Sequence, residues 1–181
     1  ELTLSVGNVN DKPEIKNWAG TAIYSEGEDP KTLAGSLVLS DADAADGNAN
    51  LSEAVVVVAN YVAGEDVFAI GEGADEQVLS PGSAVEVGTA GDFTYSYEVD
   101  GNQLTLKLSA AADAGATASD FAAVLSTLKY KNTSDAPNTA NRTLTLTVTD
   151  TSVESETASS EPSELTLSVG NVNDKPEIKN W

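Results

Sequence analysis

Two groups of oxygen-bearing side chains have the residue types that bind a hard cation. The first group contains Asn10, Asp11, Asp41, Asp43 and Asp150, and the second contains Glu26, Glu28, Asn173 and Asp174. Carboxylates that lie within a few ångströms of one another repel unless a proton or a cation lies between them. Calcium accepts about six to eight oxygen ligands in irregular geometry, whereas magnesium requires a stricter octahedron. The residues therefore favour Ca²⁺, with Mg²⁺ as the second choice.

The directions of the expected strands place the first group at one end of the molecule. Residues 15–24 and 33–40 are predicted to run in opposite directions, so the chain after residue 40 returns to the end where Asn10 lies. The alternating stretch 142–149, RTLTLTVT, delivers Asp150 to that same end. We name this end the upper pole.

The second group is expected at the opposite end, the lower pole. Glu26 and Glu28 follow the first predicted strand, and Asn173 and Asp174 follow the last one, residues 165–169. Both poles therefore collect acidic groups.

The loop after the second predicted strand, DADAADGNAN at residues 41–50, does not fit an EF-hand. Asp41, Asp43 and Asp46 are spaced one residue too widely for that calcium loop, and no helix precedes them. An ordinary solvated turn is the alternative, because Asp, Asn and Gly favour turns.

The remaining pattern predicts an all-β, Ig-like antiparallel β-sandwich with one short helix at about 117–128. Residues 55–60 are β-branched, and residues 93–99 and 103–109 alternate on either side of the turn Asp100-Gly101-Asn102. The helix is indicated by apolar residues at helical spacing, with Thr117 or Ser119 as its cap. Seven or more short strands separated by turns are typical of a sandwich.

The first eighteen residues, ELTLSVGNVNDKPEIKNW, are identical to residues 164–181, 163 residues later. A tandem array with this period explains the identity. On this interpretation residues 1–10 are the tail strand and linker of a preceding repeat, 11–172 form one complete repeat, and 173–181 begin the next. Neighbouring identical repeats are then the expected partners.

The composition excludes several classes of function. The net charge of −20 and the pI near 4.1 oppose binding to nucleic acid or to an anionic membrane surface. The chain has no Cys and no His, so it lacks the usual zinc ligands and the commonest general base. We therefore do not expect an enzyme.

A ligand-binding adhesin domain, specific for a glycan or a protein, is the alternative function. Trp18 with Tyr24, or Tyr95 with Tyr97, would stack on a sugar if their rings were exposed. The opposing interpretation is that these aromatic side chains pack between the strands.

Four stretches in order resemble the bacterial cadherin-like repeats of giant RTX and biofilm adhesins. They are the linker NVNDKP (8–13), the Asp41-Ala42-Asp43 loop, the stretch SDFAAVLSTLKY (119–130) and the strand RTLTLTVTD (142–150). The resemblance implies a cadherin-like sandwich that serves as a structural extender of a secreted, extracellular adhesin on a bacterial cell surface. In such families Ca²⁺ at the inter-repeat junctions stiffens a rod that projects a distal binding domain.

The resemblance also assigns roles to the acidic residues. It makes Asn10 and Asp11 linker ligands, Asp41 and Asp43 paired loop ligands, and Asp150 a ligand at the end of a strand. Glu26 resembles an acid that serves the following junction, at Asn173 and Asp174. The sequence departs from the cadherin linker at two positions. Asn8 stands where that linker usually has Asp, and Lys12 stands where it often has Asn. We therefore expect fewer or more weakly bound ions.

Overall fold

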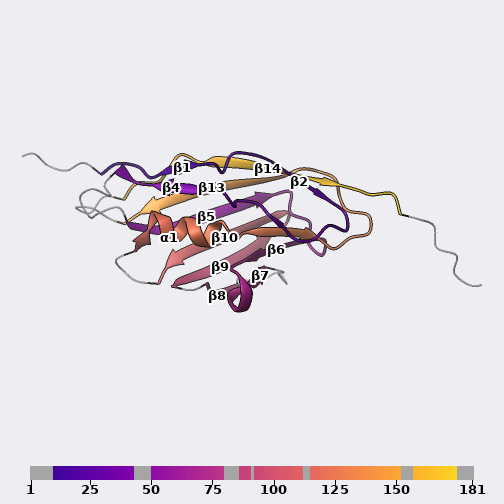
Figure 1. Cartoon of the computed structure of the whole chain (residues 1–181), viewed down its shortest axis with the longest axis horizontal. Helices are drawn as coiled ribbons and strands as arrows, with labels where there is room; N and C mark the ends of the chain where they lie inside the picture. The colour runs from indigo at the N-terminus through magenta and orange to yellow at the C-terminus, as the bar shows by residue number, and fades with distance from the viewer. Residues whose placement is uncertain are drawn as a thin grey trace, which may run out of the picture.

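The computed structural model of the chain describes residues 10–42, 50–79, 86–90, 92–111, 115–151 and 157–174. Within these ranges the protein is an all-β sandwich with one short α-helix, as predicted. The strands run along the long axis of the molecule (Figure 1). The described chain begins at one end of that axis and finishes at the other.

The larger of the two layers is the main sheet, which has the strand order β2-β14-β13-β5-β10-β9-β8. Its strands are β2 (Gly20–Ser25), β5 (Asn50–Ala59), β8 (Glu86–Ala90), β9 (Phe93–Asp100), β10 (Gln103–Ala110), β13 (Arg142–Asp150) and β14 (Ser163–Gly170), with β11 (Ala116–Thr117) paired to β5. Neighbouring strands are antiparallel except β2 and β14, which are parallel.

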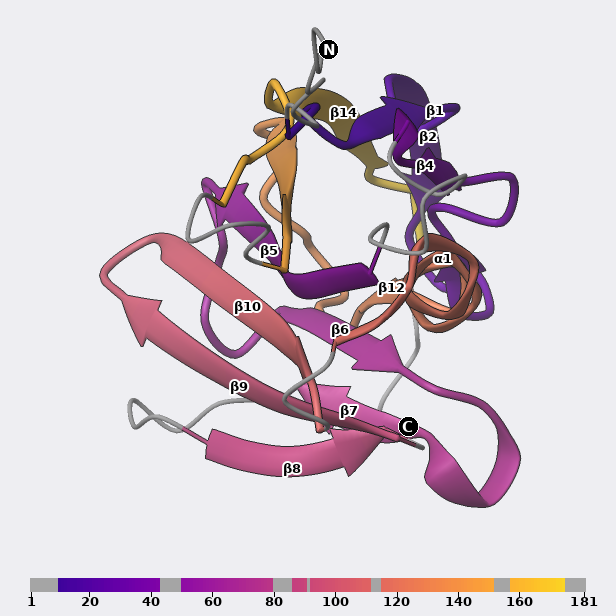
Figure 2. The same ribbon diagram turned by 90° about the vertical axis from the view of Figure 1, so that its left-hand side faces the viewer.

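The other layer contains a four-stranded second sheet and a two-stranded pair. The second sheet has the order β3-β12-β6-β7, and β1 pairs with β4. Their bounds are β1 (Glu14–Lys16), β3 (Lys31–Thr32), β4 (Val38–Ser40), β6 (Asp66–Ile70), β7 (Gln77–Leu79) and β12 (Lys129–Asn132), and a 3-10 helix, η2, spans Gly73–Asp75. An end-on view shows these elements and helix α1 on one side and the strands β5, β10 and β9 on the other (Figure 2).

The core lies between the layers and follows from strict alternation along the strands. In β13 every second side chain is buried, including Leu144, Leu146 and Val148, while the intervening threonines face outward. Strand β14 contributes Leu165 and Leu167 in the same way. This two-residue period is what a sheet with one buried face requires.

Helix α1 spans Ala118–Leu125, shorter than the predicted 117–128. Thr117 is its N-cap and forms a capping box with Asp120, in which each side chain accepts a hydrogen bond from the other residue's backbone N–H. Phe121 and Leu125 are buried, and Phe121 packs edge-to-face on Phe93 of β9. In the ranges that the structure describes, no helix is long and apolar enough to cross a membrane.

Two strand predictions were wrong in detail. Residues 15–24 are not one strand, because left-handed backbone at Asn17 (φ 62°) and at Gly20 (φ 148°) breaks the chain between β1 and β2. The two halves consequently join different sheets. Residues 33–40 form a strand only at 38–40, where β4 pairs with β1.

Candidate junction and metal site

At the upper pole, the start of the described chain lies beside the end of β13. Asn10 Nδ2 donates a hydrogen bond of 2.8 Å to Oδ2 of Asp150. The other carboxylate oxygen, Oδ1, accepts one of 2.7 Å from the backbone N–H of Ala158. Asp150 is 1% exposed. The structure thus brings Asn10 and Asp150 together, as the strand directions predicted, with both oxygens of Asp150 bonded to protein donors.

The amide oxygen of Asn10 differs from its amide nitrogen in having no donor. Oδ1 is buried and accepts no hydrogen bond from the described residues. Leaving a buried polar oxygen unsatisfied costs about 1–3 kcal/mol, so native proteins usually supply a partner, such as an ordered water or an ion. Because Nδ2 and Oδ1 belong to one planar amide, the bond to Asp150 also fixes the direction in which Oδ1 points.

Two of the predicted ligands, Asp11 and Asp41, line the same pocket of about 280 Å³ at this pole. Asp41 directly follows β4 and is 8% exposed. Asp43 lies outside the described residues. Among the residues that are described, no three carboxylates lie close enough together to hold a metal ion by themselves. Asn10 Oδ1 is a further oxygen at this pole that could bind a cation.

Lys12 provides a positive charge inside the linker. Its Nζ lies 2.9 Å from Oε1 of Glu161, just before β14, and both side chains are largely exposed. The Lys12 ammonium lowers the pKa of the Glu161 carboxyl through this hydrogen bond and through its charge. Glu161 was not among the predicted residues, although its place before the last strand puts it at the upper pole.

At the lower pole, Glu26 binds the chain that leaves β14. Its Oε2 accepts a hydrogen bond of 2.9 Å from the backbone N–H of Val172, and its own N–H donates one of 2.9 Å to Gly170 O. Glu26 and Asp174 line one pocket of about 390 Å³. The predicted meeting of Glu26 with the second linker copy is present.

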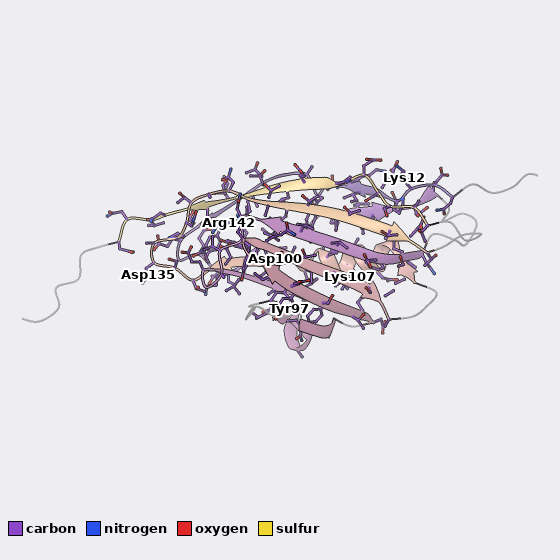
Figure 3. All side chains as sticks on the ribbon, turned by 180° about the vertical axis from the view of Figure 1, so that it is seen from behind. Lys12, Tyr97, Asp100, Lys107, Asp135 and Arg142 are labelled. Atoms are coloured by element: carbon purple, nitrogen blue, oxygen red, sulfur yellow. The ribbon has the colours of Figure 1, made fainter. Side chains whose placement is uncertain are left out.

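The other lower-pole residues have different contacts from those expected. Glu28 folds back within its own turn, where Oε2 accepts a hydrogen bond of 3.0 Å from the N–H of Ser25. Asn173 Nδ2 donates to the carbonyl oxygen of Asp174 at 3.3 Å. Asp135, which was not predicted, lines the pocket with Glu26 and Asp174. Figure 3 places it at the far end of the molecule from Lys12.

Sequence analysis also missed a buried ion pair between the layers at the lower pole. Arg142 Nε and Nη2 donate hydrogen bonds of 2.9 Å and 2.8 Å to the two carboxylate oxygens of Asp66, and both side chains have no exposed surface. Nη1 of Arg142 donates to the carbonyl oxygens of Asn138 and Ala140. Such a bidentate pair is stable in an apolar interior only when its other donors and acceptors are also satisfied.

Further donors complete the shell of Asp66. Tyr130 Oη and Asn132 Nδ2 donate to Oδ1 at 2.7 Å and 3.1 Å, and the backbone N–H of Val62 donates to Oδ2 at 2.8 Å. Asn132 Oδ1 then accepts a hydrogen bond from Ser134 N–H. The ion pair therefore anchors the loop 133–141, part of which lines the lower-pole pocket.

The aromatic side chains considered for ligand stacking are buried. Trp18 is 1% exposed, and its Nε1 donates to Leu144 O at 3.2 Å. Tyr24 is fully buried, and Tyr95 and Tyr97 of β9 are buried and stack on each other. These rings belong to the core, so they offer no open face to a sugar.

Comparison of the chain with protein-family models, with curated proteins and with solved structures found no match.

Proposed function

We propose that this chain is a structural extender repeat of a bacterial cell-surface adhesin, exposed outside the cell and stiffened by Ca²⁺ at the junctions between repeats. The observation that carries the proposal is the placement of the duplicated segment. The described linker residues of the two copies, 10–13 and 171–174, lie at opposite poles of an elongated sandwich (Figure 1). Identical units joined through this segment would extend as a rod along their long axes.

Two linker positions are described in both copies, Asn10 with Asn173 and Asp11 with Asp174, and they define the expected junction. Because residues 1–18 and 164–181 are identical, Asn173 stands to a following unit as Asn10 stands to this one. β14 ends at Gly170, and β1 of the next unit would begin at Glu177, the counterpart of Glu14. Six residues, 171–176, connect the units, and fully extended they span at most about 20 Å. The poles of neighbouring units must therefore lie close together.

The oxygen atoms of the upper pole fit a calcium ion better than any softer metal. In the proposed site, Asn10 Oδ1 and the carboxylates of Asp11 and Asp41 hold the ion, and Asp43 belongs to the same loop. Asp150 would not bind the ion directly, since both of its carboxylate oxygens already accept hydrogen bonds. It would instead orient the Asn10 amide. Glu26 and Asp174 of the preceding unit contribute their charge from the other side of the junction.

Calcium would supply positive charge where two acidic poles meet. A net charge of −20 for each 181-residue chain makes the approach of consecutive units unfavourable without a counter-charge. Two acidic poles bridged by Ca²⁺ would resist bending, whereas chelation would let them separate.

The experiment is thermal unfolding of the chain in millimolar CaCl₂ and in EGTA, with calorimetric titration of Ca²⁺ as the direct binding measurement. A ligand that binds only the folded state at a hundred times its Kd stabilises it by about 2.7 kcal/mol, so Tm should rise by several degrees. The same scans in MgCl₂ test selectivity. An unchanged Tm together with no heat of binding would overturn the calcium part of the proposal.

A further inference from the structure

We propose that consecutive repeats are also joined by a latch that needs no metal ion. In this latch Glu26 of one unit holds the backbone N–H of Val172, and Asp150 of the next unit holds the side chain of Asn173. The partner is thus a second copy of this chain, and the contact is made of hydrogen bonds to two carboxylates. The inference rests on the tandem arrangement proposed above but not on calcium.

The lower half of the latch is present in the single unit. Glu26 bonds to both Gly170 and Val172, so its backbone and side chain together hold the last residue of β14 and the two residues after it against the turn that follows β2. Val172 is the residue directly before Asn173. The lower pole therefore holds the linker up to the residue before Asn173, the residue that would contact the next unit.

The upper half is present at the other end of the same unit. Asn10 Nδ2 donates to Asp150 at 2.8 Å. Asp150 is held in turn by Ala158, and its backbone carbonyl accepts a hydrogen bond of 2.7 Å from Ser52 Oγ. These two bonds do not involve the linker, so they hold Asp150 in place as a prepared acceptor for an asparagine amide.

Because the two linker copies are identical, the two halves of the latch would act on adjacent residues, Val172 and Asn173. In a tandem pair Asn173 takes the place that Asn10 has here. In the single unit its Nδ2 donates a long hydrogen bond of 3.3 Å to the carbonyl oxygen of Asp174, and the side chain is exposed. Turning this amide to Asp150 of a following unit exchanges that weak local bond for a short bond to a charged, buried acceptor. Two units would then grip neighbouring residues of one linker.

The test uses a two-unit chain, residues 1–173 followed by 11–181, which is the smallest molecule with a complete junction. Because the chain has no cysteine, Gln103→Cys on exposed β10 of each unit accepts one spin label per unit. Electron–electron double resonance then measures the distribution of distances between the units in EGTA. We expect a narrow distribution for the parent, and broadening for Asn173→Ala or for Glu26→Ala in the first unit. The broadest distribution expected is that of two units joined by a fully flexible six-residue linker, whose r.m.s. length is about 13 Å.

The matched control is Asn10→Ala in the first unit, which removes the same side chain away from the junction and should leave the distribution narrow. Asp150→Ala in the second unit should broaden the distance distribution. If this substitution of a buried residue unfolds the unit, Asn173→Ala still tests the same contact. The latch is wrong if the parent in EGTA is already as broad as Asn173→Ala, or if Asn173→Ala changes nothing. Adding CaCl₂ tests the calcium proposal separately, because a narrow parent in EGTA supports the latch whether or not Ca²⁺ binds.

Discussion

Arg142, the first residue of β13, and Asp66, the first residue of β6, form a bidentate ion pair with no solvent exposure. The pair joins the main sheet to the second sheet across 76 residues of sequence. Tyr130 and the backbone of Val62 complete the hydrogen bonds of Asp66. The ion pair thus joins the two sheets inside the lower pole, the end that would face the next unit in the proposed array (Figure 3).

Breaking this pair should be costly. Arg142→Met leaves Asp66 buried without its counter-charge and frees the carbonyl groups of the loop 133–141, so we expect a loss of about 3–5 kcal/mol in the free energy of unfolding. Urea denaturation measures it. Lys107→Met is the matched control, because Lys107 pairs with Glu53 on the sheet surface and should cost less than about 1 kcal/mol. Equal losses for the two variants would contradict the assignment.

Tyr130 should make stability depend on pH in alkaline solution. Burial, and then its hydrogen bond to Asp66, raise the pKa of the Tyr130 hydroxyl above its ordinary value of about 10. The folded state therefore resists ionisation that the unfolded chain undergoes. Its contribution to stability is complete below pH 10 and is lost as the pH rises beyond that value.

Unfolding free energies between pH 8 and 11.5, compared for the parent and Tyr130→Phe, measure this contribution. The variant should be less stable at pH 8 by about 1–3 kcal/mol, because Asp66 loses a buried donor. It should also lose stability less steeply above pH 10. Some slope remains, since burial also raises the pKa of Tyr61. Parallel pH curves would show that Tyr130 does not titrate as described.

Gly115 should not tolerate a side chain. Its backbone has φ +74°, and a Cβ atom there would lie 2.5 Å from both Leu51 O and Thr151 Cγ2. Gly64, with φ +85° and nothing within 4 Å of a Cβ, is the matched control. We expect Gly64→Ala to cost about 1–2 kcal/mol from its backbone conformation alone. Gly115→Ala should cost about 1–3 kcal/mol more from overpacking, as measured by urea denaturation. Similar losses would mean that the backbone near Gly115 gives way freely.

Asp41→Asn tests the proposed calcium ligands. Replacing an anionic oxygen by a neutral one should weaken Ca²⁺ binding at least about tenfold, measured by calorimetric titration. Asp100→Asn, at the end of β9 near the lower pole, removes the same charge from the molecule without touching the upper pole. If both variants lowered the affinity equally, the effect would come from net charge rather than from coordination.

Part of the fold could be predicted from local pattern. Strands β9, β10, β13 and β14 have a clear two-residue period and lie close to where they were expected, and α1 is centred correctly. The interruption at Asn17 between β1 and β2 could not be predicted from the alternation of residues 15–24. It arises from the backbone conformation at Asn17, which sends the two strands into different sheets. Strands β6 and β7 were missed because they are five and three residues long, too short to show a clear two-residue period.

The candidate site was also predicted only in part. Strand directions were sufficient to bring Asn10 to Asp150 and Glu26 to the second linker copy. The contacts of Glu161 and Asp135 depend on how loops fold. Arg142 stands two residues before Leu144, so the alternation places it on the buried face, but the sequence does not identify the partner that neutralises its charge. Its partner is distant in sequence, and only packing of the two sheets reveals the pair.

The parallel pairing of β2 and β14 has a mechanical consequence. Tension along the array would pull β2 toward the upper pole through β1 and pull β14 toward the lower pole through Val172. The two strands are in register over six residue pairs, from Gly20 with Leu165 to Ser25 with Gly170. Force applied in this direction shears the ladder, so its hydrogen bonds must fail together rather than one after another. In the proposed array, the β2–β14 ladder would therefore resist stretching most strongly along the direction in which tension acts on the chain.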